Sequence, residues 1–290
     1  MEINLLSIIV PVYKAEKTIK KDLEIIYKTL KNTPYKFEII AVIDGTIDKS
    51  FSEAKKFKKD EIQILKYKTN KGKGQAVRYG MSKAKGDVIM FIDAGNEINP
   101  QGIIMLLEHM KWYDADIIVG SKSHPASKVN YPLSRRIFSK GYYYFVKLLF
   151  GLRLRDTQTG LKAYKKPVLE KVLDKLVVKR FAFDIEILAV AHMLGYKKIY
   201  DAPVQVNMNF SKTTIAGLFT NNGIWNFVKD TLAIWYRMKI LGYYNDGRKR
   251  VKNFDKELQM EVNTGDMTNK KQIIIDGINK IFHSISKQKG

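Results

Sequence analysis

Along the first part of the chain, apolar runs take turns with segments in which apolar residues recur at helical spacing. Mostly apolar runs, typical of buried strands, cover residues 5–13, 37–44, 62–67, 87–93 and 115–121. Between these runs, apolar residues recur every three or four positions, as on one face of a helix, at Ile19, Leu23, Ile26, Tyr27 and Leu30, at Ala76, Val77, Gly80, Met81 and Ala84, and at Ile103, Leu106, Leu107 and Met110. This alternation predicts an α/β fold with a mostly parallel central sheet that helices cover on both faces.

The pattern changes in the second half of the chain. Its predicted elements are, in order, a loop (123–136), an amphipathic aromatic helix (137–150), a polar tight turn (155–164), two helices (168–176 and 187–194), a strand (202–210) and a helix (222–240). From about residue 245 the chain is polar and charged, with one further helical patch at 273–285.

Composition limits the classes of function. The 290 residues are 45% hydrophobic, which is enough for a sizeable core, and they include no cysteine, so disulfides and thiolate metal sites are excluded. The N-terminus lacks the basic start and cleavage site of a signal peptide, and no run of about 18 apolar residues predicts a spanning helix. The net charge of +22 suits nucleic acid, an anionic membrane surface or phosphorylated small molecules, although a solvated lysine-rich surface would give the same value.

Carboxylates follow two of the apolar runs directly. Asp44 ends the second run and Asp93 ends the fourth, so both are expected at the carboxyl edge of the sheet, where α/β folds bind ligands. Asp93 and Glu97 supply hard oxygen ligands that suit Mg²⁺ or Mn²⁺, with Asn96 a weaker candidate. The alternative for each stretch is an ordinary Asp-containing turn.

Two other stretches carry candidate chemistry. TNKGKGQAVRYG (69–80) places glycines and lysines at the start of a helix, which suits a phosphate, but its spacing is not that of a Walker loop. A glycine-rich helix cap remains the alternative there. RDTQTG (155–160) holds Asp156 in a polar turn, whereas Asp184 and Glu186 are interpreted as acids that cap a helix.

These motifs, in this order, resemble the family 2 inverting glycosyltransferases, and most closely their dolichyl-phosphate mannose or glucose synthase branch. The segments that carry the resemblance are PVY (11–13), VIDG (42–45), NKGKGQA (70–76), FIDA (91–94), GSK (120–122), RDTQTG (155–160), FDIE (183–186) and APV (202–204). The resemblance covers about residues 5–210. It implies a GT-A domain over residues 1–212. Beyond that domain, the residue pattern itself predicts an amphipathic helical membrane-interface segment over 213–244 and a charged extension over 245–290.

The resemblance also assigns roles to residues of this chain. The residues expected to bind the nucleotide-sugar are Pro11, Tyr13, Glu16, Asp44, Lys73, Asp93 and Ala94, and those expected to hold Mg²⁺ or Mn²⁺ are Asp93 and Glu97. Lys122 and Arg135 or Arg136 would face phosphates of the donor or acceptor, and Asp156 would lie near the anomeric carbon. The chain departs from the family at Gly95, which replaces the second acid of the Asp-x-Asp metal motif, and at Ile43, where another acid is lost.

The implied reaction is displacement at the anomeric carbon, with a nucleoside diphosphate as the leaving group. A hydroxyl acceptor would need Asp156 as general base, whereas a polyprenyl phosphate is largely ionised at pH 7 and would need only orientation. The aromatic, basic segments 137–152 and 222–244, with Trp225 and Trp235, suit a helix at an anionic membrane surface. We therefore expect a peripheral protein on the cytoplasmic face of a membrane. The alternative is that these helices pack on the sheet or between subunits.

Several rival functions stay open. One is a transferase that acts on a glycan or glycolipid hydroxyl. A nucleotidyltransferase is disfavoured because PVYKAEK lacks the glycines of such enzymes, and nucleic-acid binding is disfavoured because no recognised module is present. An inactive transferase is the last alternative, given the acids lost at Ile43 and Gly95.

Overall fold

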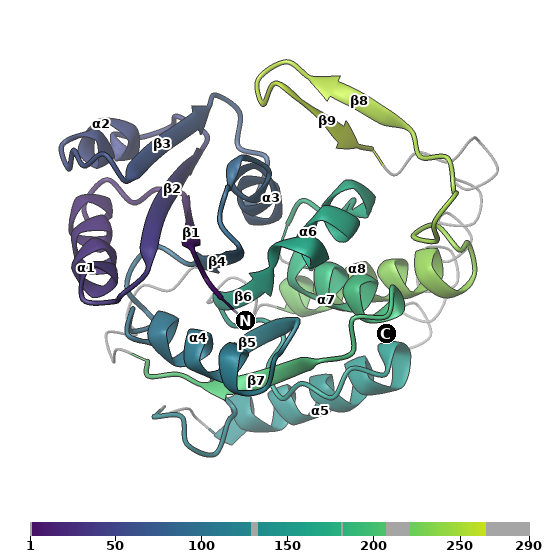
Figure 1. The fold of residues 1–290 in the computed structure, drawn as a ribbon. Helices are drawn as coiled ribbons and strands as arrows, with labels where there is room; N and C mark the ends of the chain where they lie inside the picture. Colours follow the sequence, from purple (N-terminus) through teal and green to yellow (C-terminus); the bar gives the residue numbers. More distant parts are fainter. Residues whose placement is uncertain (1, 129–132, 181, 207–220, 265–290) are drawn as a thin grey trace.

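A seven-stranded sheet forms the centre of the molecule in the computed structural model, which describes residues 2–128, 133–180, 182–206 and 221–264 (Figure 1). The strand order is β3-β2-β1-β4-β6-β5-β7. Only β6 runs antiparallel to its neighbours. The strands are β1 (Leu5–Val12), β2 (Lys36–Asp44), β3 (Ile62–Tyr67), β4 (Val88–Ile92), β5 (Ile117–Ser121), β6 (Leu161–Lys165) and β7 (Ile199–Pro203).

Helices cover both faces of this sheet, as the sequence predicts. One face packs against α1 (Ile19–Lys31), α2 (Ser50–Lys55) and α4 (Gly102–Trp112). The other face packs against α3 (Lys73–Lys83), α5 (Leu133–Phe150), α6 (Lys166–Val172), α7 (Phe183–Met193) and α8 (Asn221–Lys239). Adjacent residues of β1 enter opposite cores, Ile8 on the α1 side and Ile9 on the α3 side, which explains why the strand is continuously apolar.

The second half of the sheet differs from the sequence prediction. The segment predicted as a polar turn over 155–164 contains β6, whose apolar pattern is interrupted by the fully buried Lys162. The strand predicted over 202–210 begins earlier, as β7, and Gln205 and Val206 form isolated bridges beyond it. The rest of that predicted strand, residues 207–210, and the helical patch at 273–285 lie outside the described residues.

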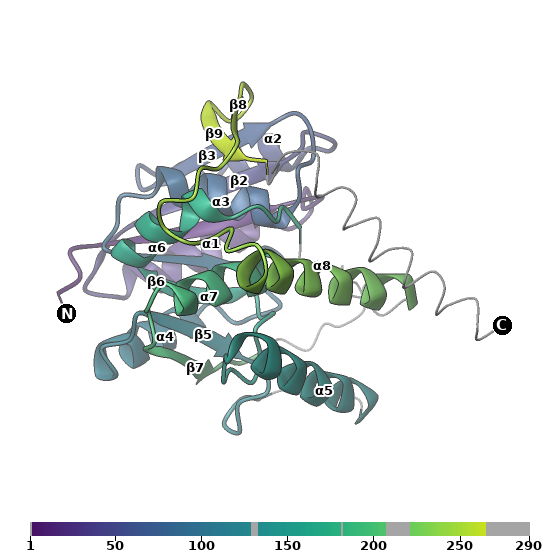
Figure 2. The same ribbon diagram turned by 90° about the vertical axis from the view of Figure 1, so that its right-hand side faces the viewer.

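The helices α5 and α8 lie side by side along one side of the molecule (Figure 2). The rings of Tyr142 and Phe227 are 4.9 Å apart, and the Tyr142 hydroxyl lies 3.1 Å from that of Thr231. Ile234 and Met238 of α8 are buried in the same core as α3 and α7. No described helix is long and apolar enough to cross a membrane.

The polar extension after α8 contains a two-stranded hairpin that the sequence pattern does not predict. Its strands are β8 (Lys252–Asp255) and β9 (Met260–Asn263), which pair antiparallel. Leu258 in the turn and Val262 in β9 are buried in the core beside α3. The residues between α8 and the hairpin are also anchored, because Tyr243 and Tyr244 are fully buried.

A buried carboxylate ties this extension to the domain. Glu186 of α7 has no exposed surface and accepts backbone hydrogen bonds from Val177 and Val178, at 3.0 and 2.9 Å, and one from the Tyr244 hydroxyl at 2.7 Å. It therefore bonds to neighbouring segments rather than capping the helix that contains it. A buried charge is stable only where donors replace its lost water.

We expect Tyr244→Phe to lower the free energy of unfolding by about 1.5–3 kcal/mol, because it removes a hydrogen bond to a buried charged group. Denaturant unfolding followed by circular dichroism measures the change. Tyr144→Phe is the matched control, since Tyr144 is 64% exposed and its substitution should leave the midpoint unchanged. Equal midpoints for the two variants would contradict a stabilising role for the Tyr244 hydroxyl.

Candidate active site

The predicted site residues gather at the carboxyl end of β4, beside β1. The chain leaves β1 and β4 toward opposite halves of the sheet, and α/β folds open a crevice for ligands at such a point. Because β6 runs antiparallel to β4, the first residue of β6, Leu161, lies opposite Ile92 at the end of β4. Next to this pair, the Asp93 amide donates to the Gly160 carbonyl at 2.9 Å. The turn that contains Asp156 therefore reaches the same edge. A Cβ at Gly160 would collide with the Asp93 carboxylate, so only glycine fits there.

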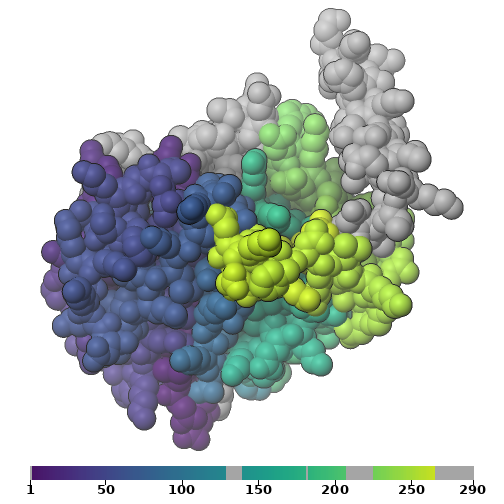
Figure 3. Space-filling view, turned by 90° about the horizontal axis from the view of Figure 1, so that it is seen from above, coloured from purple at the N-terminus to yellow at the C-terminus, as the bar shows by residue number. Residues whose placement is uncertain are grey.

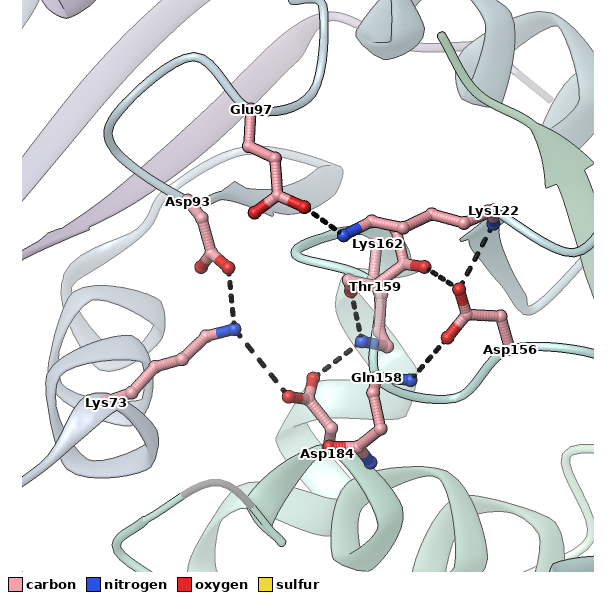
Figure 4. Close-up of polar contacts among 9 residues, drawn as sticks. All are labelled: Lys73, Asp93, Glu97, Lys122, Asp156, Gln158, Thr159, Lys162 and Asp184. Carbon is pink, nitrogen blue, oxygen red and sulfur yellow. Dashed lines mark hydrogen bonds and ion pairs between the residues drawn. The ribbon is translucent and has the colours of Figure 1, made fainter. Parts of the chain in front are cut away.

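Two lysines and two aspartates form a continuous ion-pair network in this crevice (Figure 4). The Lys73 ammonium lies 2.9 Å from Oδ2 of Asp93 and 3.7 Å from Oδ2 of Asp184. The other oxygen of Asp184 accepts from Lys162 at 2.6 Å, and Lys162 also donates to the Thr159 carbonyl at 2.6 Å. Asp184, interpreted from sequence as a helix-capping acid, instead links β6 and α3 from the first turn of α7.

Burial and charge act in opposite directions on these lysines. Burial alone would lower the pKa of Lys73, but the carboxylates of Asp93, Asp184 and Glu97 outweigh it and raise that pKa above its usual value. For Lys162, burial prevails over the attraction of Asp184 and lowers the pKa. The carboxylates thus keep Lys73 positively charged despite its burial.

Asp156 is held in one orientation by three donors. Its Oδ1 accepts from the Gln158 amide at 3.0 Å, and its Oδ2 accepts from the Lys122 amide at 3.1 Å and from the Thr159 hydroxyl. A carboxylate offers about four lone-pair positions, so one remains for a substrate hydroxyl or an orienting contact. The carboxylate is partly exposed on the crevice side of the turn.

Glu97 and Lys122 form a second ion pair across the crevice. The Lys122 ammonium lies 2.5 Å from Oε1 of Glu97, and both side chains are largely buried. The sequence assigns Glu97 to a metal and Lys122 to a phosphate. In the structure each is bound to the other, so a ligand at either residue would have to compete with this pair.

The turn between Asp93 and Glu97 depends on a buried acid that the sequence interpretation missed. Asp22 of α1 accepts from the Gly95 amide at 2.9 Å and from the Asn96 side chain at 2.5 Å. Burial raises the pKa of Asp22, and these two donors oppose that effect. Gly95 has φ +101°, and no atom of the described residues lies within 4 Å of the position of a Cβ there. Among the described residues, the place of the family's second acid is therefore open space.

The residues fit a divalent cation that is shared with a diphosphate. Oδ1 of Asp93 is buried and has no hydrogen-bond partner among the described residues, which leaves one carboxylate oxygen for a cation. The described part of the chain contains no group of three or more acidic or histidine side chains that could hold a metal alone. Mg²⁺ is commonly bound by one or two carboxylates, with substrate phosphates and water completing its shell.

The Asp44 side chain is more buried than its position at the end of β2 suggests. It is 3% exposed, and its carboxylate accepts from the amides of Lys71 at 2.7 Å and Gly72 at 3.0 Å. Its expected contact with the nucleotide stays a prediction. In the structure it shapes residues 69–72, the loop that leads into α3 and Lys73, and we call these residues the donor loop.

The other predicted residues occupy the rim or fall outside the described side chains. Pro11 lies in β1, and Tyr13 and Glu16 lie in the loop that follows it, where both are exposed and Glu16 accepts from the Lys49 amide at 3.0 Å. Ala94 follows Asp93 directly and is partly exposed. Arg135 and Arg136 belong to α5, but their side chains lie outside the part of the chain that the structure describes.

Similarity to known proteins agrees with this geometry. Residues 7–173 match the family described as glycosyl transferase family 2. The chain is 31% identical over 248 residues to a dolichyl-phosphate beta-glucosyltransferase of Drosophila melanogaster, covering 80% of this chain and 74% of that protein. It is 28% identical over 218 residues to the dolichyl-phosphate beta-glucosyltransferase of Homo sapiens, covering 70% and 66% respectively.

Solved structures share the fold at low sequence identity. Mannosyl-3-phosphoglycerate synthase from Rubrobacter xylanophilus superposes with a TM-score of 0.62 at 12% identity, covering 88% of this chain and 82% of that one. Glucosyl-3-phosphoglycerate synthase from Mycobacterium tuberculosis, solved with Mn²⁺ and uridine diphosphate, gives 0.59 at 14%, covering 90% and 87%. The sheet order, the crevice and the family match lead to one conclusion: the chain is a glycosyltransferase of the GT-A fold and belongs to glycosyl transferase family 2.

Proposed function

We propose that this glycosyltransferase moves glucose from a nucleoside diphosphate sugar to a polyprenyl phosphate of the dolichyl type. The observation that carries the proposal is the meeting of Lys73, Asp93 and the Asp156 turn at the end of β4. It occurs in a chain that is 31% identical to a dolichyl-phosphate beta-glucosyltransferase, and the names of such relatives favour glucose over mannose. Asp93 and Lys73 would face the donor diphosphate, and Lys122 would face the acceptor phosphate.

In the proposed reaction, an acceptor oxygen forms a bond to the anomeric carbon while the bond from that carbon to the diphosphate breaks. Lys73 neutralises negative charge that develops on the leaving diphosphate, and the buried Asp184 and Lys162 hold its ammonium in place. Asp93 would hold a divalent cation, which would supply Lewis-acid stabilisation of the same charge. A phosphate acceptor needs no deprotonation at pH 7, so Asp156 orients the acceptor or the sugar rather than removing a proton.

The alternative acceptor, a glycan or glycolipid hydroxyl, gives Asp156 a different role. A hydroxyl must lose its proton as the new bond forms, so a base is required, and Asp156 has a free lone-pair position for that proton. The two acceptor classes therefore differ in how strongly the rate depends on this carboxylate.

The first prediction from the proposed function concerns the donor and the acceptor. We expect transfer from UDP-glucose to a short polyprenyl phosphate in the presence of Mg²⁺ or Mn²⁺, with little transfer from GDP-mannose and none in EDTA. Radiolabelled donors and extraction of the lipid product measure this. Binding of UDP-glucose without transfer to the lipid phosphate would favour a hydroxyl acceptor, and failure to bind either donor would favour an inactive transferase.

The second prediction concerns Asp93. Because Asn cannot supply the charge that Asp93 offers to a cation, Asp93→Asn should lower kcat by about 10²–10³-fold, as loss of one electrostatic stabiliser does. It should also raise the metal concentration needed for half-maximal activity. Asp60→Asn is the control, because Asp60 is exposed just before the start of β3, at the edge of the sheet opposite the carboxyl ends of the strands. Equal metal requirements for both variants would argue against Asp93 as a ligand.

The third prediction separates the roles of Asp156 by pH. With a phosphate acceptor, kcat/KM should rise as the pH increases through about 6, where the second proton leaves a phosphate monoester, and should level off above it. Asp156→Asn should keep that profile at a lower overall rate. If the variant loses the rising limb, Asp156 is the titrating base and the phosphate-acceptor mechanism is wrong.

We further propose that α5 and α8 rest on an anionic membrane surface, with the catalytic domain facing the cytoplasm. Tyr144 and Leu148 of α5 are 64% and 83% exposed, Lys147 lies beside them, and Trp225 of α8 is 57% exposed. Exposed aromatic and aliphatic side chains with neighbouring lysines are typical of interfacial helices. The net charge of +22 supports the same attraction.

The fourth prediction tests this surface. Leu148→Asp and Trp225→Ala should each reduce sedimentation with vesicles that contain phosphatidylserine, because each removes apolar surface from the contact. Trp112→Ala is the matched control, since Trp112 is 84% exposed on α4, on the opposite face of the sheet. A loss of sedimentation as large for the control as for Trp225→Ala would contradict the proposed face.

A further inference from the structure

The hairpin β8–β9 lies across the molecule between its N-terminal half and the α6 region (Figure 3). It lies outside residues 7–173, which match the transferase family, and none of the family motifs falls within it. Its turn and β9 are nevertheless firmly anchored. Leu258 and Val262 are buried in the main core, and the Asn263 side chain accepts from the Tyr243 hydroxyl and donates to the Lys175 carbonyl at 3.1 Å.

Two carboxylates of the hairpin form ion pairs with the donor loop, whereas Lys252 of β8 lies 3.7 Å from Asp174. The Lys71 ammonium lies 2.7 Å from Oδ2 of Asp255 and 3.3 Å from Oε2 of Glu257. The three side chains are only 20%, 21% and 31% exposed, so water screens these pairs less than it screens ordinary surface pairs. Asp255 also accepts from the amides of Glu257 and Leu258, which fixes the carboxylate in the turn of the hairpin.

The backbone of Lys71 is held from the opposite side by the catalytic domain. Its amide and that of Gly72 donate to the buried Asp44. Gly72 has φ +96°, and a Cβ there would lie 2.6 Å from the Lys179 carbonyl, so the loop has little room to shift. The next residue is Lys73, which pairs with Asp93 in the crevice. The hairpin thus contacts a loop that directly precedes the cation expected at the donor phosphates.

From this arrangement we infer that the hairpin is a latch for donor binding, in which Asp255 and Glu257 are positioning residues that hold the donor loop through Lys71. The inference rests on the proposed function, because it takes the crevice at Asp93 as the nucleotide site. A loop that is already ordered loses less conformational entropy when the nucleotide binds, so the latch raises donor affinity. It makes no contact with the reacting atoms, so the rate at saturating donor should not depend on it.

A purely structural hairpin would behave differently from a latch. Loss of structural contacts lowers the stability of the whole chain and changes KM and kcat through the fraction of folded enzyme. Loss of the latch raises KM for the donor, leaves kcat unchanged and loosens only the donor loop. The variant Asp255→Asn with Glu257→Gln removes both charges while Asn keeps an oxygen for the turn, so it isolates the ion pairs.

The experiment measures UDP binding by isothermal titration calorimetry and amide hydrogen exchange in the full chain. We expect D255N/E257Q and, separately, K71M to weaken UDP binding by about three- to tenfold, as expected for a partly buried ion pair. Combining all three substitutions should weaken binding no more than K71M alone, because both changes remove the same interaction. The Lys71 and Gly72 amides should exchange faster in D255N/E257Q, with or without UDP.

Lys68→Met is the matched control, since Lys68 is exposed immediately before the donor loop, and it should leave affinity and exchange unchanged. If the wild-type chain binds UDP and the variants bind it equally well, the latch is wrong and the proposed function stands. If the wild-type chain binds no nucleotide, the proposed function fails and donor binding by the latch fails with it. Additive losses in the triple variant, or loss only where the unfolding midpoint also falls, would mean that the hairpin is merely structural.

Discussion

The ion pair between Lys162 and Asp184 is the interaction on which the site depends. Both side chains are shielded from water, with exposures of 0% and 2%, and their charged atoms are 2.6 Å apart. Burying two charges is costly, and removal of one partner would leave the other uncompensated, at a cost of about 3–5 kcal/mol. The pair joins β6 to the start of α7. The other carboxylate oxygen of Asp184 pairs with Lys73 of α3. Three elements from distant parts of the chain are thereby fixed around Asp93.

The first half of the fold could be predicted from the sequence because its signals are local. The first five strands are mostly apolar runs, and a stripe of helical period follows the first, third and fourth of them, so parallel crossovers are the simplest connection. The strand β6 could not be found in this way. Its lysines at 162 and 165 break the apolar pattern, and Lys162 is tolerated in the core only because Asp184 neutralises it.

The same reasoning explains which parts of the site were predicted. Asp93, Lys73 and Asp156 lie in motifs whose position along the chain implies the edge of the sheet, and the structure brings them together. The roles of Asp22, Lys162 and Asp184 arise from contacts across the fold, with side-chain partners 22, 74 and 111 positions away. No local pattern distinguishes such residues from a helix-capping acid or a surface lysine. The division of the chain near residues 212 and 244 stays a prediction.

The charged side chains of the crevice form lysine–carboxylate ion pairs that a bound ligand can separate. Lys73 and Lys122, the two lysines expected to meet phosphates, are each held by a carboxylate at 2.9 and 2.5 Å. A lysine held in this way loses little side-chain freedom when a phosphate replaces or joins its partner, which lowers the cost of reorganisation. A phosphate on these lysines would partly release Asp93 and Glu97 from their ion pairs. These are the two carboxylates that the sequence assigns to a metal. Binding of a diphosphate together with a divalent cation would therefore preserve the balance of charge in the crevice.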